Sequence, residues 1–308
     1  MNSAGLLTVR ASLNGDSLDG VEVCLQRPSV TKLFIGQIPE AVVKTIPYLY
    51  TLCAHAQRAA AQAALSAALG EVRRPVDDGE LWMEMLHENL WRLLLDWPTA
   101  LALPSDQAAF VAWRTARHSE AGLDETRKLL AGPLREMAEK CLEKLGDQLP
   151  PDTSGERAND QMPPTAGLAP AEWLDYWQGQ AALPPVVRQP SSVLGAYRAR
   201  LAEIKGAAQA LLDGEAYPVA AAGCDGWGVA QTRTARGVLT HAVHVEEGRV
   251  LSYRVAAPTD AFFADARPLL ALLAQRRFDS PEAARQAIEQ AILALDPCLP
   301  YTLELNDA

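Results

Sequence analysis

Two cysteines from opposite ends of the chain are the residues best suited to chemistry. Cys53 lies in the segment PYLYTLCAHAQ, residues 47–57, and Cys298 lies in the segment DPCLPY, residues 296–301. Cysteine thiolates are soft ligands that suit iron, nickel and other transition metals. An alanine-rich run without Gly or Pro follows Cys53, so we expect that residue near a helix N-terminus, where unpaired amides and the helix dipole favour a thiolate. Taken alone, each cysteine is more typical of a small buried side chain.

The other three cysteines give no sign of ligand chemistry. Cys24 alternates with three apolar residues of a predicted strand and therefore points away from them. Cys141 falls on the apolar stripe of a predicted helix and is expected in the core. Cys224 falls in GCDGWG, residues 223–228, for which we predict a flexible loop. Because the five cysteines are widely spaced and lack a Cys-x-x-Cys pair, we expect reduced thiols and no structural zinc.

Composition indicates an ordinary globular protein. The chain has 308 residues, of which 49% are hydrophobic and 21% charged, enough to build a large core. A formal net charge of −10 argues against a nucleic-acid surface. The chain shows neither a signal-like N-terminus nor a long uncharged apolar run. We therefore expect a cytoplasmic protein with no membrane segment, formed as a single domain over residues 1–308.

Hydrophobic periodicity predicts a mainly helical α+β fold with small antiparallel β-hairpins. Hairpins are expected over residues 7–25 and 238–255, and helices over 54–69, 80–97, 105–116, 124–145 divided at Pro133, 170–177, 192–212, 268–276 and 281–295. Residues 147–170 are rich in Pro, Gly and polar residues and are expected to form a flexible loop. In the second hairpin, His241 and His244 are three apart, so they point to opposite faces and make a poor chelating pair. The last helix leads directly into the segment that holds Cys298.

The two cysteine segments resemble the metal-binding motifs of the NiFe-hydrogenase large subunit. There, R-x-C-G-x-C-x-x-x-H near the N-terminus meets D-P-C-x-x-C-x-x-H at the C-terminus. Other segments follow the family order: GQIPEA at 36–41, ARGVLTH at 235–241 and APT at 257–259. The resemblance implies a truncated large-subunit-like fold with central helices. Arg236 and Thr259 correspond to residues that donate hydrogen bonds to cyanide ligands of the iron.

Departures from the family motifs argue against hydrogenase activity. Tyr50 and Tyr301 replace one cysteine of each pair, and a phenol cannot replace a thiolate in a four-sulfur nickel site. Tyr48 replaces the motif arginine, and Gln57 and Glu304 replace the two histidines. We therefore expect no enzymatic activity and no nickel, although Cys53 and Cys298 remain as two possible iron ligands.

This combination resembles hydrogenase accessory proteins of the HupK/HoxV type. The resemblance implies a scaffold that holds the Fe(CN)2(CO) fragment transiently through Cys53 and Cys298 and transfers it to the hydrogenase large-subunit precursor. Arg236, Thr259 and Asp296 would bind the fragment's ligands or support those that do, with Asp296 orienting Arg236. Hyp-type maturation proteins, including a small HypC-like carrier, are the further expected partners. Two alternatives remain open, a structural or chaperone-like partner that binds no metal and an enzyme with an altered metal site.

Overall fold

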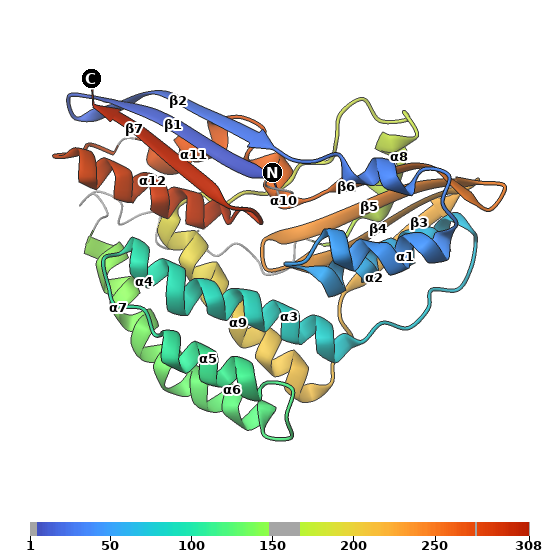
Figure 1. Cartoon of the computed structure of the whole chain (residues 1–308), viewed down its shortest axis with the longest axis horizontal. Helices are drawn as coiled ribbons and strands as arrows, with labels where there is room; N and C mark the ends of the chain where they lie inside the picture. The colour runs from blue at the N-terminus through green and yellow to red at the C-terminus, as the bar shows by residue number, and fades with distance from the viewer. Residues whose placement is uncertain (1–4, 148–166, 275, 308) are drawn as a thin grey trace.

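A computed structural model describes residues 5–147, 167–274 and 276–307. Figure 1 shows two β-sheets above a body of helices, with the first and last strands of the chain side by side in the first sheet. The predicted flexible loop at 147–170 falls largely outside the described residues. Its flanks are in place, since Asp147 ends one helix and Pro170 begins the next.

The first sheet joins the two ends of the chain. Strands β1 (Leu6–Asn14) and β2 (Ser17–Gln26) form the predicted antiparallel hairpin, and β7 (Tyr301–Asp307) pairs with β1 in parallel, in the order β2-β1-β7. Strand β7 was not predicted, because its only sheet partner is almost the whole chain away. Its pairing ties the segment after Cys298 to the N-terminal strand.

The second sheet is an antiparallel meander of four strands in sequence order. It consists of β3 (Val219–Cys224), β4 (Trp227–Thr234), β5 (Gly237–Glu246) and β6 (Arg249–Ala256). The predicted hairpin at 238–255 is confirmed. The predicted flexible loop at 223–228 is wrong, because Cys224 pairs with Trp227 across a tight β3–β4 turn. Asp225 and Gly226 take the positive φ angles, 49° and 78°, that this turn needs.

Helices α1 (Pro39–Leu49) and α2 (Ala54–Ala68) cover one face of this sheet (Figure 1). The alanine-rich α2 approaches the sheet closely because two strand residues facing it are glycines. A Cβ added to Gly228 would lie 2.0 Å from the carbonyl oxygen of Ala64, and one added to Gly223 would lie 2.4 Å from that of Ala67. This close contact fixes the height and rotation of α2, and therefore the position of Cys53 at its start.

The helical body begins with a long helix that changes its pitch near the middle. It runs from α3 (Asp78–Trp91) through a π-helical segment η2 (Arg92–Asp96) into α4 (Trp97–Ala100). The Asp77 carboxylate caps α3 by accepting from the amide of Glu80 at 3.0 Å. The body continues with α5 (Gln107–Ala116), α6 (Gly122–Ala131), α7 (Pro133–Asp147) and α9 (Val193–Asp213). The prediction that Pro133 divides two helices is confirmed, whereas the π segment was not predicted.

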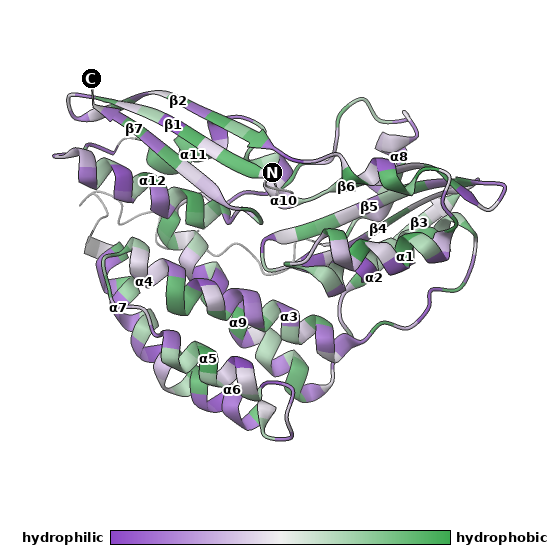
Figure 2. Ribbon diagram, viewed as in Figure 1, coloured by the Kyte–Doolittle hydropathy of each residue, from purple (hydrophilic) through white to green (hydrophobic). Residues whose placement is uncertain are grey.

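Four short helices and the longer C-terminal helix α12 complete the helical elements of the described residues. They are η1 (Val30–Phe34), α8 (Pro170–Trp177), α10 (Pro258–Phe262), α11 (Arg267–Leu273) and α12 (Pro281–Leu295). Apolar residues form stripes along the helices and alternate along the strands (Figure 2). Their burial joins β1, α3, α9 and α12 in one hydrophobic cluster that includes Cys53 and Cys141. Within the described ranges, no helix combines the length and apolar character needed to cross a membrane.

Candidate functional site

Asp296 ends α12 and lies at the centre of a buried network of charges. It takes a left-handed backbone conformation with φ 48°, which closes the helix before Pro297. Its side chain is only 3% exposed. Oδ1 accepts from Nε of Arg92 at 2.7 Å, and Oδ2 accepts from Nη2 of Arg200 at 2.8 Å. Burial by itself would raise the pKa of Asp296, but Arg92, Arg200 and Arg236 outweigh it and hold the pKa below its usual range.

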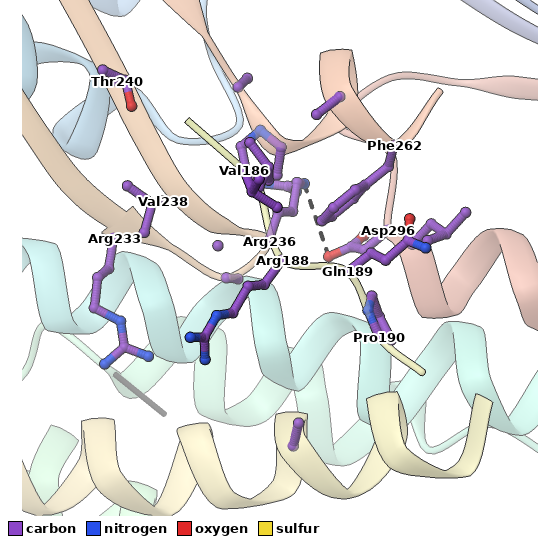
Figure 3. Close-up of a pocket in the computed structure, with 18 of the residues that line it drawn as sticks. Val186, Arg188, Gln189, Pro190, Arg233, Arg236, Val238, Thr240, Phe262 and Asp296 are labelled. Atoms are coloured by element: carbon purple, nitrogen blue, oxygen red, sulfur yellow. Dashed lines mark ion pairs between the residues drawn. The ribbon is translucent and has the colours of Figure 1, made fainter. Parts of the chain in front are cut away.

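Arg236 enters this network from the turn between β4 and β5. Its Nη1 donates to Oε2 of Glu88 on α3, whereas its Nε lies 3.9 Å from Oδ2 of Asp296 (Figure 3). Asp296 therefore does not orient Arg236 by a hydrogen bond, as the sequence suggested; Glu88 does so instead, because Arg92 and Arg200 occupy the Asp296 oxygens. Nε of Arg236 and Oε1 of Glu88 are buried without a hydrogen-bond partner among the described residues. The unpaired Nε–H of Arg236 is therefore a buried donor close to Asp296 but beyond hydrogen-bond distance of it.

Cys298 follows Asp296 by two residues and is only partly buried. Its sulfur accepts from Nη2 of Arg27 at 2.7 Å and from the hydroxyl of Thr259 at 3.3 Å. Thr259 also accepts from the backbone amide of Cys298 at 3.2 Å. Thr259, which the sequence analysis selected, therefore does contact this sulfur. Arg27 was not selected.

Cys53 is buried at the start of α2, as the sequence predicted. Its sulfur accepts a long hydrogen bond, 3.6 Å, from Nε2 of Gln57. Oε1 of Gln57 lies 2.8 Å from Nε2 of His241, and Nδ1 of His241 lies 2.8 Å from the hydroxyl of Tyr253. Burial lowers the pKa of His241 to about 3, so the ring is neutral. We assign its proton to Nε2, because that ring nitrogen faces the amide oxygen of Gln57 and leaves the amide nitrogen for the sulfur.

The prediction that the helix N-terminus favours a Cys53 thiolate is wrong in this structure. Burial raises the pKa of the Cys53 thiol and Glu88 raises it further, while Arg236 acts in the opposite direction. The first backbone amides of α2 donate to a different acceptor. Those of His55 and Ala56 donate to the Glu84 carboxylate at 2.8 Å and 3.0 Å. Glu84 therefore uses the N-terminal amides that would otherwise stabilise a thiolate.

The two sulfurs lie in one electrostatic environment. Burial would lower the pKa of Arg236, but Glu88 and Asp296 raise it, as do Cys53 and Cys298. Burial raises the pKa of Tyr50 to about 12; Arg27 acts against this, while Asp260 and both sulfurs add to it. Buried groups that raise or lower one another's pKa lie in the same region of the fold. The fold thus brings together the two cysteines that the sequence analysis selected, with Arg236 beside them.

The residues that replace the family's motif residues lie in different parts of the fold. Tyr50 lies beside both sulfurs, as described above. Tyr301 begins β7, and the charged groups acting on its hydroxyl are Glu289, Asp96 and Arg92 rather than the cysteines. Tyr48 is 82% exposed, and Glu304 pairs with Arg10 on the outer surface of the first sheet. Only one of the two lost cysteine positions therefore still faces the site.

A cavity of about 610 Å³ lies against the other side of the charged network. Residues 185–191, β4, β5, α9 and α10 line it together with Arg236 and Asp296. Figure 3 shows Arg236 extending toward Asp296, while Arg188 and Arg233 lie on the opposite side of the view. Neither cysteine lines this cavity. Nη2 of Arg233 pairs with Oε1 of Glu203 at 3.1 Å, so this charge is already balanced.

The donor set suits a metal that brings most of its own ligands. Across the described residues, no group of three or more His, Cys, Asp or Glu side chains could hold a metal ion. Two sulfurs alone cannot complete the coordination shell of a bare ion. Two soft sulfur ligands are instead suited to a metal complex whose remaining positions are already filled.

Sequence reasoning missed several residues of the site. Arg27, Glu88, Arg92, Arg200 and Asp260 come from five separate elements, and no local motif connects them. Glu88 carried one weak signal, because a carboxylate within the predicted apolar helix 80–97 needs a buried partner. Arg27 carried no signal, because it follows an ordinary strand.

The arrangement of helices and sheets is shared with known structures. A Ni-Fe-Se hydrogenase from D. vulgaris Hildenborough superposes with a TM-score of 0.60 over 93% of this chain and 94% of that chain, at 12% sequence identity. This likeness concerns the fold alone. The chain has a shortened form of the α+β fold of the NiFe-hydrogenase large subunit, as the sequence motifs indicated.

Sequence comparison gives a narrower relationship. The chain is 31% identical to the hydrogenase expression/formation protein HupK of Azotobacter vinelandii, over 99% of this chain and all of that protein. It is 26% identical to the hydrogenase expression/formation protein HoxV of Cupriavidus necator, over the whole chain and 98% of that protein. No protein-family model matches the chain. The chain belongs to the HupK family of hydrogenase expression/formation proteins.

Proposed function

We propose that this chain acts in hydrogenase maturation as a scaffold that holds the Fe(CN)2(CO) fragment and transfers it to the precursor of a NiFe-hydrogenase large subunit. Cys53 and Cys298 would bind the iron. Arg236 and Thr259 would donate hydrogen bonds to its diatomic ligands. Asp296 would act indirectly, by holding Arg92 and Arg200 and by ending α12 so that Cys298 faces the site.

The observation that carries this proposal is the convergence of two sulfurs on a buried arginine with a free donor. The pair comes from opposite ends of the chain, and Arg236 interacts electrostatically with both sulfurs. Its Nε has no hydrogen-bond partner among the described residues. A buried planar donor suits a ligand that accepts hydrogen bonds, such as the nitrogen of metal-bound cyanide.

Two sulfur ligands also suit release. An iron that already carries three diatomic ligands needs few protein ligands, so two thiolates of the large-subunit precursor could replace Cys53 and Cys298 one at a time. The number of iron-sulfur bonds would then be the same before and after transfer. The chain itself would perform no catalysis, in keeping with the accessory names of its relatives.

The partners follow from this role. The large-subunit precursor would receive the fragment, and Hyp-type maturation proteins, including a small HypC-like carrier, would supply it. The half-exposed side of Cys298 is where a donor or acceptor protein would reach the iron.

Infrared spectroscopy tests the proposal. The protein is purified without oxygen from cells that contain the maturation proteins, alongside Cys53→Ala and Cys298→Ala variants. Cyanide and carbonyl stretching bands are expected in the unaltered chain and should be lost in both variants. Cys24→Ala is the matched control, because Cys24 is an exposed thiol on β2.

Two results would overturn the proposal. Stoichiometric nickel with hydrogen turnover would favour an enzyme with an altered metal site. A chain that binds the large-subunit precursor but never carries iron or cyanide would instead favour the structural or chaperone-like partner.

A further inference from the structure

Arg27 is a charged side chain outside the hydrogenase motifs that contacts a candidate ligand sulfur. It follows the end of β2, and its side chain is 24% exposed. Nη2 donates to the sulfur of Cys298 at 2.7 Å. Nη1 lies 3.1 Å from Oδ1 of Asp260 and donates to Oδ2 at 3.3 Å. One guanidinium therefore links a sulfur and a carboxylate.

Asp260 holds this arginine in a defined orientation. Its Oδ2 accepts from the backbone amide of Ala257 at 3.1 Å, at the start of α10. The same short helix carries Thr259, the second donor to the sulfur of Cys298. The carboxylate is thus fixed by backbone and occupies one edge of the guanidinium. The other edge remains directed at the sulfur and the space beside it.

A simple surface ion pair does not account for this arrangement. Pairs such as Arg277 with Asp16, 2.8 Å apart, are well exposed on both sides and touch no sulfur. Arg27 and Asp260 are less exposed, and Arg27 also influences Tyr50 at the position of a lost family cysteine. The contact of Arg27 with Cys298 is therefore part of the site rather than of the outer surface.

The charge of the proposed cargo calls for more than one cation. In the Fe(CN)2(CO) fragment the two cyanides balance iron(II), so binding through two thiolates leaves a net negative charge. Arg236 approaches the sulfur pair from the β4–β5 turn, and its charge is partly offset by Glu88, as that of Arg27 is by Asp260. Arg27 reaches Cys298 from β2. The site thus has one guanidinium on the Cys53 side and one on the Cys298 side.

We propose that Arg27 is a second cyanide-recognition residue of this chain, which donates to one cyanide nitrogen while Arg236 donates to the other. The inference rests on the proposed function and assigns the cargo a defined orientation within that site. Each guanidinium keeps a carboxylate on its far side, Asp260 for Arg27 and Glu88 for Arg236.

The test compares Arg27→Met and Arg27→Lys with Arg277→Met as a matched control. All variants are produced with the maturation proteins and purified without oxygen. In Arg27→Met, one of the two cyanide bands should shift while the other stays in place. The rate at which a chelator removes iron should rise about tenfold or more, because a hydrogen bond to a charged partner is lost. Arg27→Lys keeps the charge without the planar fork and should fall between. Arg277→Met should match the unaltered chain.

The outcomes distinguish a failure of the role of Arg27 from a failure of the proposed scaffold function. If the unaltered chain shows both cyanide bands and neither Arg27 variant moves a band or changes the release rate, the role of Arg27 is wrong and the scaffold stands. If no variant, including the unaltered chain, carries cyanide bands, the proposed function itself fails. Thermal unfolding of each variant shows that it is folded, and Arg27→Lys provides the readout should Arg27→Met not fold.

Discussion

The two candidate ligand sulfurs differ in nearly every physical respect. Cys53 is buried at the start of a helix held tightly against a sheet, and its sulfur accepts only a long contact from a neutral amide. Cys298 is partly exposed, follows a left-handed turn, and accepts a short contact from an arginine. We call them the inner and the outer sulfur.

Under the proposed function, this difference implies that the two sulfurs have different roles in holding and releasing the iron. The inner sulfur lies among Glu88, Arg236 and the Gln57–His241 pair, none of which can move without leaving buried polar groups unpaired. The outer sulfur is partly exposed, and its partner Arg27 is also within reach of solvent. The iron would therefore stay attached to Cys53 while the bond to Cys298 exchanges, so transfer to the large subunit would begin at the outer side.

The largest effect is expected from Asp296→Ala, which removes the centre of the inner charge network. Arg200 would lose its carboxylate and keep the neutral side chain of Asn89, while Arg92 would keep Asp96 and the Pro297 carbonyl but lose its most buried partner. Breaking a buried pair in this way typically costs about 3–5 kcal/mol of unfolding free energy. Chemical denaturation measures the loss. Glu304→Ala, which breaks only the exposed pair with Arg10, should change stability by less than about 1 kcal/mol. If both variants lost the same unfolding free energy, the buried network around Asp296 would stabilise the fold no more than the surface pair does.

The next effect concerns the seating of the helix that carries the inner sulfur. Gly228→Ala would place a methyl group 2.0 Å from the backbone oxygen of Ala64, so α2 must shift. Overpacking of this kind costs about 1–3 kcal/mol. Gly206→Ala in α9 meets no atom within 4 Å and should instead stabilise by roughly 0.5–1 kcal/mol, because alanine is the better helix former. Thermal unfolding of both variants should show shifts of opposite sign. If Gly228→Ala left the thermal stability unchanged, α2 would pack less closely against β4 at this position.

The third effect is a pH dependence at Glu84, which caps α2 beneath the inner sulfur. Burial and the neighbouring Glu88 raise the pKa of Glu84 to about 8. Because its folded pKa exceeds its unfolded value near 4.5, the folded state binds more protons between these values and loses stability as pH rises through this window. Glu84→Gln has no such titration. Its stability relative to the unaltered chain should therefore improve between pH 5 and pH 8 by about 1–2 kcal/mol, allowing for relaxation of the site. A constant difference across the window would contradict the raised pKa.

The smallest effect is a difference in thiol reactivity. With exposed Cys24 and Cys224 replaced by Ser, the outer sulfur should react with a maleimide more than about tenfold faster than the inner one, because access and thiolate fraction both control the rate. Peptide mass spectrometry after timed labelling measures both sites, and buried Cys141 serves as an internal control. Similar rates at Cys53 and Cys298 would show that the inner sulfur is not protected.

The sequence allowed the elements and the cysteine pair to be predicted, but not the partners of that pair. Helices such as 54–69 and hairpins such as 238–255 follow from local periodicity, so their prediction needed no tertiary information. The selection of Cys53, Cys298, Arg236 and Thr259 depended on motifs in family order. Strand β7 and the β3–β4 hairpin were missed, since short strands with alanine or polar residues form only where a neighbour accepts their hydrogen bonds.

The roles of charged residues were the hardest to foresee. Asp296 was assigned to Arg236 because the motif places them in the same site. Which of three nearby guanidiniums takes a carboxylate oxygen depends on ångström distances that the chain order does not contain. For the same reason, the weak thiolate character of Cys53 could not be predicted, because it depends on Glu84 and Glu88 from a different helix.

The parallel pairing of β7 with β1 bears on how the protein is made. During translation, β1, β2 and the helix that begins at Cys53 leave the ribosome early, whereas Cys298 and β7 emerge only after most of the polypeptide has been synthesised. Until then the edge of β1 that β7 will occupy is open, and Arg27 has no sulfur to contact. A nascent chain thus cannot assemble the two-sulfur site, which restricts any loading to chains in which the last strand has already been added to the sheet.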